Sequence, residues 1–517
     1  MKRTEEPMNR TTEEPCLLQF GCMAYWLGID VGTGGTRALL VDEVGQVRHA
    51  STAPHEDVRM ERPLWAEQRP ENWWDAAQQA VRSVLAEAKI TGKDVRGVGL
   101  SGQMHGLVIL DASYQVIRPA LIWSDQRSQP QVDWINHTVG KDAVLRYTAN
   151  PVLTGFTLPK LLWVRDNEPR NFDRVKKMLL PKDYVRFRLT GEFASDVSDA
   201  SGTALFDVVQ RRWSFEMMEA LKLDRGILAC VYESSDVTGG ITAEAARDTG
   251  LEPGTPVVGG GGDQASSAVG NGIVETGVVS CTLGTSGVVF AHSDKPQYDP
   301  AGRVHTFCHA VKGAWHVMGV TQGAGLSLQW FRNQLAPGTD YDALTAEAAT
   351  APAGSQGLYW LPYLMGERTP HLDASVRGGW IGLTAKHKRA DLIRSLLEGV
   401  SYSQKDCLDI IEQIGVSLDS VRVSGGGARS PFWRQMLADV FDKRVVTLQT
   451  QEGSAYGAAL LALVGTGVYQ SVPEVSKAAI REVDSVSPQQ DSVRVYAKGH
   501  AVYQSLYPAL KAFYHSA

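Results

Sequence analysis

Hydrophobic residues recur along the chain in patterns typical of both amphipathic helices and buried strands. In residues 72–88 (NWWDAAQQAVRSVLAEA), apolar side chains repeat at helical spacing and share one face: Trp73, Ala77, Val81, Val84, Leu85 and Ala88. The run VRGVGLSG, residues 95–102, follows as a buried strand. The second half repeats the alternation, with a helix over residues 390–414 and a strand within 418–428 that runs into a glycine turn. Strand–helix alternation in both halves predicts an α/β architecture.

Two stretches far apart in the chain share one pattern of apolar, glycine and threonine positions. Residues 28–42 (GIDVGTGGTRALLVD) and 281–294 (CTLGTSGVVFAHSD) each place a tight Gly/Thr turn between β-type runs, which predicts a β-hairpin. We interpret them as an internal duplication that produces two related domains. The length of 517 residues also exceeds one compact core. We expect a boundary near residues 265–276, with domains over 23–270 and 271–517.

The two ends of the chain differ in what they predict. Residues 1–22 are polar and charged up to Pro15, and we expect them to be disordered or to result from a start codon upstream of Met23. Residues 496–517 predict one amphipathic helix that packs on its own domain. We expect its apolar face to consist of Val502, Leu506, Leu510 and Phe513.

Composition and charge exclude several classes of function. The chain is 43% hydrophobic and 21% charged, as in soluble globular proteins, and a net charge of -6 gives no support to a nucleic-acid surface. The six cysteines form no CxxC pair, so we expect reduced thiols in a cytoplasmic protein and no disulfide frame or zinc site. Residues 453–473 lack charges, but they are rich in small residues. A helix packed closely inside a domain therefore fits them better than a membrane span.

Four glycine-rich turns follow β-type runs, at residues 32–36, 259–262, 284–287 and 425–427. Glycine at a strand end lets backbone N–H groups converge on an anion, and Thr and Ser hydroxyls add donors. None of the four matches GxxxxGK[ST] or GxGxxG, so the sequence predicts neither a P-loop nor the dinucleotide site of a polyol dehydrogenase. Each turn alone is better explained as structural. Together with the duplication, they favour two hairpins that hold a triphosphate between the domains.

Four consecutive glycines, residues 259–262, directly precede Asp263. A flexible linker would carry Ser, Pro or charge on both sides, whereas strand-like TPVV and helix-like ASSAVG flank this run. We therefore expect a strand end that a ligand approaches closely. Asp263 is the candidate general base, and Asp30 in GIDVGT is a candidate Mg²⁺ ligand acting through water, because hard cations prefer carboxylate and phosphate oxygens. A turn-capping role is the alternative for both aspartates.

The motifs GIDVGTGGT, GGGGDQ, LGTSG and SGGGARSPFW together resemble the FGGY family of carbohydrate kinases. Residues 155–167 resemble the N-terminal signature of the family, and residues 378–399 resemble its C-terminal signature, with Leu396 a small departure. The resemblance runs from about Tyr25 to the C-terminus. It implies two ribonuclease-H-like domains, as in actin, Hsp70 and hexokinase, with a catalytic cleft between them. It also implies ATP and Mg²⁺.

The resemblance assigns roles to individual residues. Asp263 would accept the proton of the sugar hydroxyl, and Asp30 would help to hold Mg²⁺. Met104 and His105, in SGQMHGLVILD, stand where family members that phosphorylate D-xylulose contact the sugar, and Gln264 would touch it too. The residues expected to border the phosphates are Thr33, Thr36, Gly284, Thr285 and Ser286. The other expected nucleotide contacts are Gly325, Gly425, Gly426 and Gly427.

The reaction implied by the resemblance is phosphorylation of D-xylulose by ATP to D-xylulose 5-phosphate, a step of pentose catabolism. Another FGGY kinase, acting on ribulose, fuculose, rhamnulose, gluconate or an alditol, is an alternative, because only the loop at Met104 and His105 argues against it. A non-catalytic actin-like or Hsp70-like ATP switch is another. The sequence leaves open whether the protein is a homodimer. It also gives no role to the loop MGERTPHLD, residues 365–373.

Overall fold

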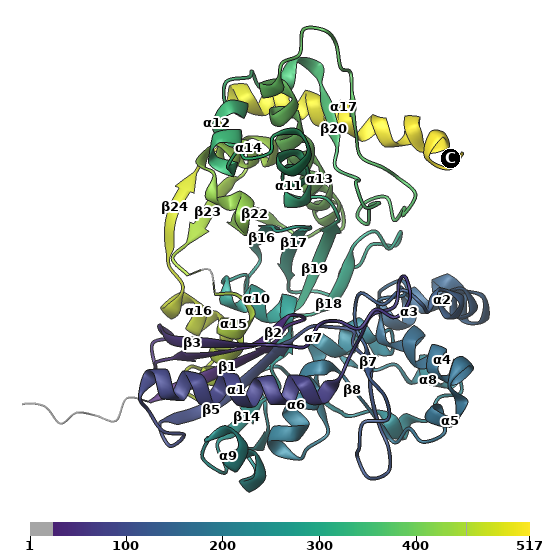
Figure 1. The fold of residues 1–517 in the computed structure, drawn as a ribbon, viewed down its shortest axis with the longest axis vertical. Coiled ribbons are helices and arrows are strands. Elements are labelled where there is room, and N and C mark those ends of the chain that lie inside the picture. The colour runs from purple at the N-terminus through teal and green to yellow at the C-terminus, as the bar shows by residue number, and fades with distance from the viewer. Residues whose placement is uncertain (1–23, 451, 517) are drawn as a thin grey trace, which may run out of the picture.

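The computed structural model describes residues 24–450 and 452–516, which form two lobes (Figure 1). The expectation of disorder for residues 1–22 lies outside the described residues. Each lobe is built on a seven-stranded mixed sheet. The first sheet has the order β13 (Val237–Gly240), β14 (Pro256–Val258), β5 (Val95–Gly102), β1 (Tyr25–Val31), β2 (Gly35–Val41) and β3 (Val47–Pro54), with β15 (Gly261–Gly262) pairing with β5. The second has the order β18 (His305–Cys308), β19 (Trp315–Thr321), β17 (Gly287–Ser293), β16 (Gly277–Leu283), β22 (Leu418–Ser424), β23 (Arg444–Leu448) and β24 (Glu482–Val486).

The two sheets share one pairing pattern, which confirms the predicted duplication. Strand β1 pairs antiparallel with β2 and parallel with β5, and β16 pairs antiparallel with β17 and parallel with β22. The outer pairs correspond as well, since β3 and β19 are antiparallel to β2 and β17. The hairpins expected in residues 28–42 and 281–294 are β1–β2 and β16–β17. The predicted α/β architecture is confirmed.

Helix α1 (Pro70–Ala88) covers one face of the first sheet, packing on β2 and β3. It begins two residues before the predicted start because Pro70 suits the first helical position. Trp73, Ala77 and Val81 are buried, as the periodicity predicts. In the second lobe, α13 (Arg389–Gln413) packs on β17 and β19, close to the predicted range 390–414.

Helix α15 (Ser454–Gly465) belongs to the second half of the sequence but lies on the opposite face of the first sheet, against β1 and β5. A Cβ at Gly28 would overlap the carbonyl oxygen of Ala455, and a Cβ at Gly99 would overlap that of Ala458. The helix backbone therefore rests directly on the sheet, which explains its small residues. The close packing expected for residues 453–473 is confirmed, and no helix within the described residues is long and apolar enough to cross a membrane.

The C-terminal helix α17 (Gln490–Tyr514) forms as predicted, but the predicted apolar face is partly wrong. Val502 is 42% exposed and Phe513 is 67% exposed, whereas Leu506 and Leu510 pack against the core of the second lobe. The buried face is made of polar aromatic residues instead: Tyr496, His500 and Tyr503. Hydrophobicity alone misses these residues because each also has a hydrogen-bond partner.

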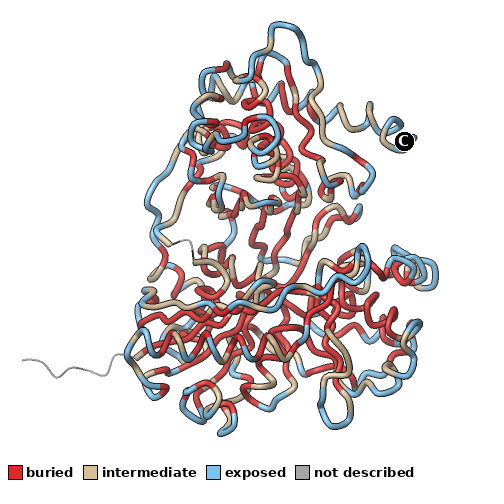
Figure 2. The backbone as a smooth tube through the Cα atoms, in the orientation of Figure 1, coloured by how far each residue is buried: buried red, intermediate tan, exposed pale blue. Residues whose placement is uncertain are grey.

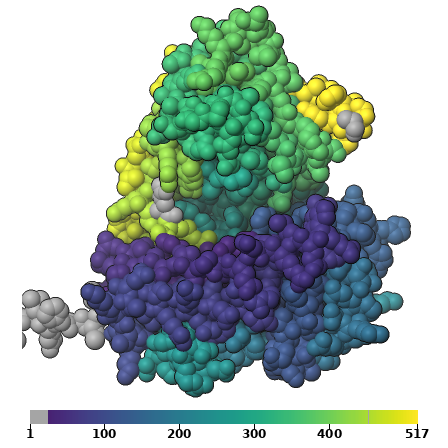
Figure 3. All heavy atoms as spheres, in the orientation of Figure 1, coloured from purple at the N-terminus to yellow at the C-terminus, as the bar shows by residue number. Residues whose placement is uncertain are grey.

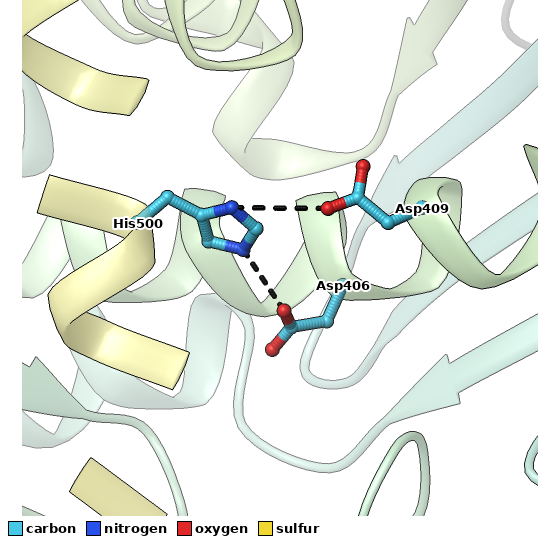
Figure 4. A group of neighbouring side chains, drawn as sticks. All are labelled: Asp406, Asp409 and His500. Carbon is cyan, nitrogen blue, oxygen red and sulfur yellow. Dashed lines mark hydrogen bonds and ion pairs between the residues drawn. The ribbon is translucent and has the colours of Figure 1, made fainter. Parts of the chain in front are cut away.

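His500 docks α17 on α13 through two aspartates (Figure 4). Its Nε2 lies 2.9 Å from Asp406 Oδ1, and its Nδ1 lies 3.8 Å from Asp409 Oδ2. Gln504 also donates to Asp406, and Lys405 forms an ion pair with Asp409. Because protein donors already satisfy both carboxylates, we interpret this cluster as structural packing and not as a metal site.

The remaining elements surround the two sheets, whose central strands form the buried interior of the lobes (Figure 2). Phe307, Cys308 and Met318 of the second lobe share a hydrophobic cluster with Phe156 and Leu158 of the first, which joins the lobes on one side.

The helices of the first lobe and its flank are α2 (Gln129–Ile135), α3 (Lys141–Thr148), α4 (Thr157–Asn167), α5 (Pro169–Phe172), α6 (Pro181–Thr190), α7 (Val197–Ala200), α8 (Phe215–Ala220), α9 (Ala243–Thr249) and α10 (Asp263–Gly270). The further helices of the second half are α11 (Gly325–Leu335), α12 (Tyr341–Ala348), α14 (Pro431–Phe441) and α16 (Val472–Ala479). The short strands are β4 (Glu67–Gln68), β6 (Val108–Leu110), β7 (Ala120–Leu121), β8 (Lys177–Leu179), β9 (Ala194–Asp196), β10 (Phe206–Asp207), β11 (Arg212–Trp213), β12 (Cys230–Tyr232), β20 (Tyr359–Leu361) and β21 (Gly379–Ile381).

Candidate active site

Three parallel strands of the first sheet, β1, β5 and β15, end at one edge. Val31 pairs with Gly102 on one side of β5, and Gly262 pairs with Gly102 on the other. Asp30 is therefore one residue before the end of β1, and Asp263 comes directly after β15 as the first residue of α10. The fold brings the two predicted carboxylates to the same edge of the first sheet. The surface of the molecule is hollowed where the two lobes meet (Figure 3).

The glycine run forms a strand end with no room for side chains, as interpreted from the sequence. Gly260 has φ +70° and a Cβ there would overlap the carbonyl oxygen of Leu100. A Cβ at Gly262 would lie 2.9 Å from Cγ of Met104. Strand β14 precedes the run and helix α10 follows it, so the segment is not a linker. The glycines are required because β5 and the Met104 loop press directly against this backbone.

Burial raises the pKa of both carboxyl groups. Burial raises the pKa of Asp30 to about 6, while the neighbouring Ser101 hydroxyl and the charge of Arg37 oppose it. Burial raises the pKa of Asp263 to about 7, the charge of Asp30 raises it further, and hydrogen bonds from Gln264 lower it. Two carboxyl groups that titrate near neutrality in one place are typical of a catalytic site.

A buried ionic cluster that the sequence analysis missed lies beneath the glycine run. Lys182 Nζ is 2.6 Å from Asp183, 2.7 Å from Asp196 and 3.2 Å from Asp199, and all four side chains are buried. Two neighbours of the cluster bond to the glycine backbone: Ser198, which donates to Asp196, and Arg186, which pairs with Asp183.

In the first of these bonds, the Gly262 N–H donates to Ser198 Oγ at 3.1 Å, and that hydroxyl donates to Asp196 at 2.5 Å. In the second, Arg186 Nη1 donates to the carbonyl oxygen of Gly259 at 2.9 Å. The cluster thereby fixes the backbone on both ends of the run that delivers Asp263.

The two threonines predicted in the first hairpin point in different directions. Thr33 Oγ1 accepts a hydrogen bond from Trp123 Nε1 at 3.0 Å at the exposed end of the hairpin. Thr36 is fully buried, and its hydroxyl lies 2.8 Å from His55 Nε2. Thr33 Oγ1 donates to Gln103 Oε1 at 3.4 Å, and Gln103 Nε2 donates to the Gly32 carbonyl at 3.3 Å. A phosphate contact by the Thr36 hydroxyl stays a prediction that requires its bond to His55 to open.

The predicted nucleotide glycines of the second lobe converge on the turn between β16 and β17. The Gly325 N–H donates to the Gly284 carbonyl at 2.7 Å, and the Leu326 N–H donates to the Thr285 carbonyl at 3.1 Å. Gly425 has φ +84°, and a Cβ there would lie 2.6 Å from the Leu283 carbonyl oxygen. Three glycine segments distant in sequence thus share one surface, which includes Ser286, Gly426 and Gly427, and Thr285 is exposed on it.

The loop with Met104 and His105 adjoins the glycine run. Met104 is buried and packs against Gly262, while the His105 ring stacks on Phe156 with 4.8 Å between ring centroids. His105 Nδ1 lies 2.7 Å from the carbonyl oxygen of Gly202. Since a carbonyl only accepts, Nδ1 carries the proton and Nε2 is an acceptor.

Burial, followed by the charge of Lys160, lowers the pKa of His105 to about 3, so the ring is neutral at physiological pH. Lys160 Nζ donates to the His105 carbonyl at 2.9 Å and to the Gly155 carbonyl at 2.6 Å, which fixes the loop. Gln264 directly follows Asp263 in the first turn of α10. The sequence analysis missed Lys160 and Gln103, although both lie in stretches that carry the family resemblance.

Comparison with known proteins shows the family of this chain. Residues 25–270 match the model of the N-terminal domain of the FGGY family of carbohydrate kinases, and residues 279–466 match that of the C-terminal domain. The chain is 38% identical to the xylulose kinase of Bacillus subtilis over 95% of this chain and 98% of that protein. It is 42% identical to the xylulose kinase of Escherichia coli over 87% and 92%. The crystal structure of xylulose kinase from Rhodospirillum rubrum is 31% identical and superimposes with a TM-score of 0.89, covering 95% of this chain and 100% of that chain.

Matching domain models, curated relatives and solved structures all cover both lobes. The chain therefore belongs to the FGGY family of carbohydrate kinases.

Proposed function

We propose that this protein transfers the γ-phosphoryl group of ATP to D-xylulose, giving ADP and D-xylulose 5-phosphate. The observation that carries the proposal is the contact of Met104 with Gly262, which joins the expected sugar loop to the residue preceding Asp263. The relatives named as xylulose kinases support D-xylulose as the substrate. The neutral His105 ring supports the assignment because its Nε2 can accept a hydrogen bond from a sugar hydroxyl.

Asp263 would act as the general base. A base is most efficient when its pKa lies near the working pH, and burial together with Asp30 raises the pKa of Asp263 to about 7. Asp263 would accept the proton of the sugar hydroxyl while that oxygen attacks the γ-phosphorus. Its position is set by β15 and by the bond from Gly262 N–H to Ser198, so little reorganisation is needed during transfer.

Asp30 fits a role in holding Mg²⁺. Its Oδ1 is buried and has no hydrogen-bond partner among the described residues, so this oxygen is free for a cation or for a water bound to one. Carboxylate oxygens are ligands that Mg²⁺ prefers, usually with several waters retained. When bound, the cation neutralises charge on the phosphate oxygens.

The glycine turns would bind the rest of the nucleotide. The turn at Thr33 in the first lobe and the turn of Gly284, Thr285 and Ser286 in the second present backbone N–H groups and hydroxyls suited to phosphates. Gly325 and the segment Gly425–Gly427 would lie against the nucleotide beyond them. The support is their convergence on one turn, where added side chains would collide with backbone.

The reaction can be tested by identifying the product. Purified protein with Mg-ATP and D-xylulose is expected to yield one new phosphomonoester, with the phosphate on C5 by ³¹P–¹H correlation. The Asp263→Asn variant should yield none over the same time. A wild-type reaction that forms ADP and free phosphate at the same rate with and without the sugar would refute the proposal.

A further inference from the structure

Lys160, in the first turn of α4, is fully buried and makes no ion pair with any residue that the structure describes. Lys182, which is also fully buried, differs because three aspartates lie within 3.2 Å of its ammonium group. Burial lowers the pKa of Lys160 to about 7. Since a buried ammonium without a carboxylate partner lowers stability, the hydrogen bonds of Lys160 indicate what the residue is for.

These hydrogen bonds hold the backbone of the sugar loop. Lys160 Nζ donates to the carbonyl oxygen of His105 at 2.9 Å and to that of Gly155 at 2.6 Å. Thr157 Oγ1 donates to the same His105 carbonyl at 3.1 Å. Thr157 and Lys160 are three residues apart in α4, so they lie on one face of the helix. One helix therefore supplies two donors to a single carbonyl oxygen of the loop.

The backbone of His105 needs such support because its φ is +69°, in the left-handed region that side chains other than glycine rarely adopt. The imidazole ring is fixed separately, by the bond of Nδ1 to the Gly202 carbonyl and by stacking on Phe156. Its Nε2 forms no hydrogen bond with the described part of the chain, and the residue is only half-buried. One ring nitrogen is thus held in place while the other is left for a ligand.

Lys160 also links the two rings that stack on each other. Gly155, whose carbonyl accepts from Lys160, directly precedes Phe156, and the Phe156 and His105 rings lie 4.8 Å apart between centroids. The ammonium group therefore bonds to the backbone next to one ring and to the backbone of the other. Loss of these bonds would free both segments to move and would displace the imidazole.

We propose that Lys160 is a positioning residue of the sugar site, whose ammonium group binds the His105 and Gly155 carbonyls and so holds the imidazole where it contacts the sugar. This inference rests on the proposed function, in which His105 is a sugar contact. Lys160 acts through His105 and not by touching the sugar. Two other roles compete with this one: direct contact of Lys160 with the sugar, and support of α4 alone.

The first variant is Lys160→Met, which keeps much of the length of the side chain and removes the charge and the donors. We expect kcat/KM for D-xylulose to fall about 10- to 100-fold, mainly through KM, while KM for ATP stays within about twofold of wild type. Lys177→Met is the matched control, because Lys177 Nζ also donates to two carbonyls, those of Gly226 and Leu228, in the flank of the first lobe. It should behave as wild type.

The decisive comparison repeats Lys160→Met in a His105→Ala protein. If Lys160 acts through the imidazole, the substitution should cost less than about twofold in kcat/KM for D-xylulose once that ring is absent. A lysine that touches the sugar, or that only supports α4, would lose the same factor in both backgrounds. Equal losses would therefore overturn the inference.

Thr157 provides a second test that does not depend on the folding of Lys160→Met. Thr157→Val removes the other donor to the His105 carbonyl and should lower kcat/KM for D-xylulose about 3- to 10-fold. Thr157→Ser keeps the hydroxyl and should recover most of that loss, and thermal unfolding checks that each variant is folded. Equal losses in the Val and Ser variants would contradict the inference.

Failure of the inference and failure of the proposed function give different results. A wild-type protein that phosphorylates D-xylulose, together with a Lys160→Met protein of unchanged kcat/KM, would overturn the inference alone. A wild-type protein that phosphorylates no ketose would overturn the proposed function, and the inference with it.

Discussion

The negative charge of Asp30 raises the pKa of Asp263 across the edge of the first sheet. The two residues belong to β1 and to the end of β15, which flank β5 on either side. Burial raises the pKa of both carboxyl groups, and the charge of Asp30 raises that of Asp263 further. Asp263 therefore titrates near neutral pH, where a general base is most efficient.

Replacing the proposed base should abolish activity without unfolding the protein. We expect Asp263→Asn to lower kcat by about 10²- to 10⁴-fold, the range typical of general-base catalysis. KM for ATP should change little, since Asp263 would contact the sugar. Steady-state ADP release and thermal unfolding check this together. Retention of more than about a tenth of wild-type kcat would exclude Asp263 as the base.

The pH dependence of kcat/KM should report the pKa of Asp263 and the effect of Asp30 on it. Because the base must be ionised, kcat/KM for the sugar is expected to rise with pH and to level off above about pH 7, the pKa of Asp263. Asp30→Asn removes a negative charge, so the midpoint should move to lower pH even though the overall rate falls. A midpoint that stays in place in Asp30→Asn would contradict the coupling.

The same shift predicts a stability difference that depends on pH. The folded-state pKa of Asp263 is raised, so ionising it in the folded protein is unfavourable between its unfolded value near 4 and about 7. The free energy of unfolding of the wild type therefore falls as pH rises through that window. Asp263→Asn avoids the loss and should be more stable than wild type at pH 8, by about 1 to 3 kcal/mol. The difference should vanish near pH 4, and denaturant unfolding at both pH values measures it.

How far the sequence predicts the fold depends on whether a feature is local. The hairpins in residues 28–42 and 281–294 follow from alternating β-branched residues around Gly/Thr turns, all within one short stretch. The buried cluster of Lys182, Asp196 and Asp199 does not, because a sequence pattern assigns charged residues to the surface, and they become buried only when α6 packs against β9. Nothing in the local sequence indicates that meeting.

The placement of two helices shows the same limit. The small residues of α15 predict close packing, but they do not show that the helix packs on Gly28 and Gly99 of the other lobe. In α17, the aliphatic residues suggest a face that includes Val502, whereas the observed face is set by Tyr503 and by the bond of His500 to Asp406. Polar partners far away in the sequence decide which side of the helix is buried.

Two adjacent glycines offer a test of the nucleotide surface. Gly425 has φ +84°, and a Cβ there would lie 2.6 Å from the Leu283 carbonyl, while Gly426 has open space around it. Gly425→Ala should destabilise the fold by about 1 to 3 kcal/mol and raise KM for ATP. Gly426→Ala, the matched control, should change stability by less than about 1 kcal/mol. Equal losses of stability in the two variants would contradict the strain assigned to Gly425.

The central claim is tested most directly by sugar-dependent ADP release with Mg-ATP across D-xylulose, D-ribulose, L-ribulose, L-fuculose, L-rhamnulose, glycerol and gluconate. We predict slow ADP release without sugar and strong stimulation by D-xylulose above all others, lost in Asp263→Ala. A preference for another sugar would contradict the assignment of Met104 and His105 while leaving the base in place. A rate that no sugar changes would contradict the account of a sugar kinase built around Asp263.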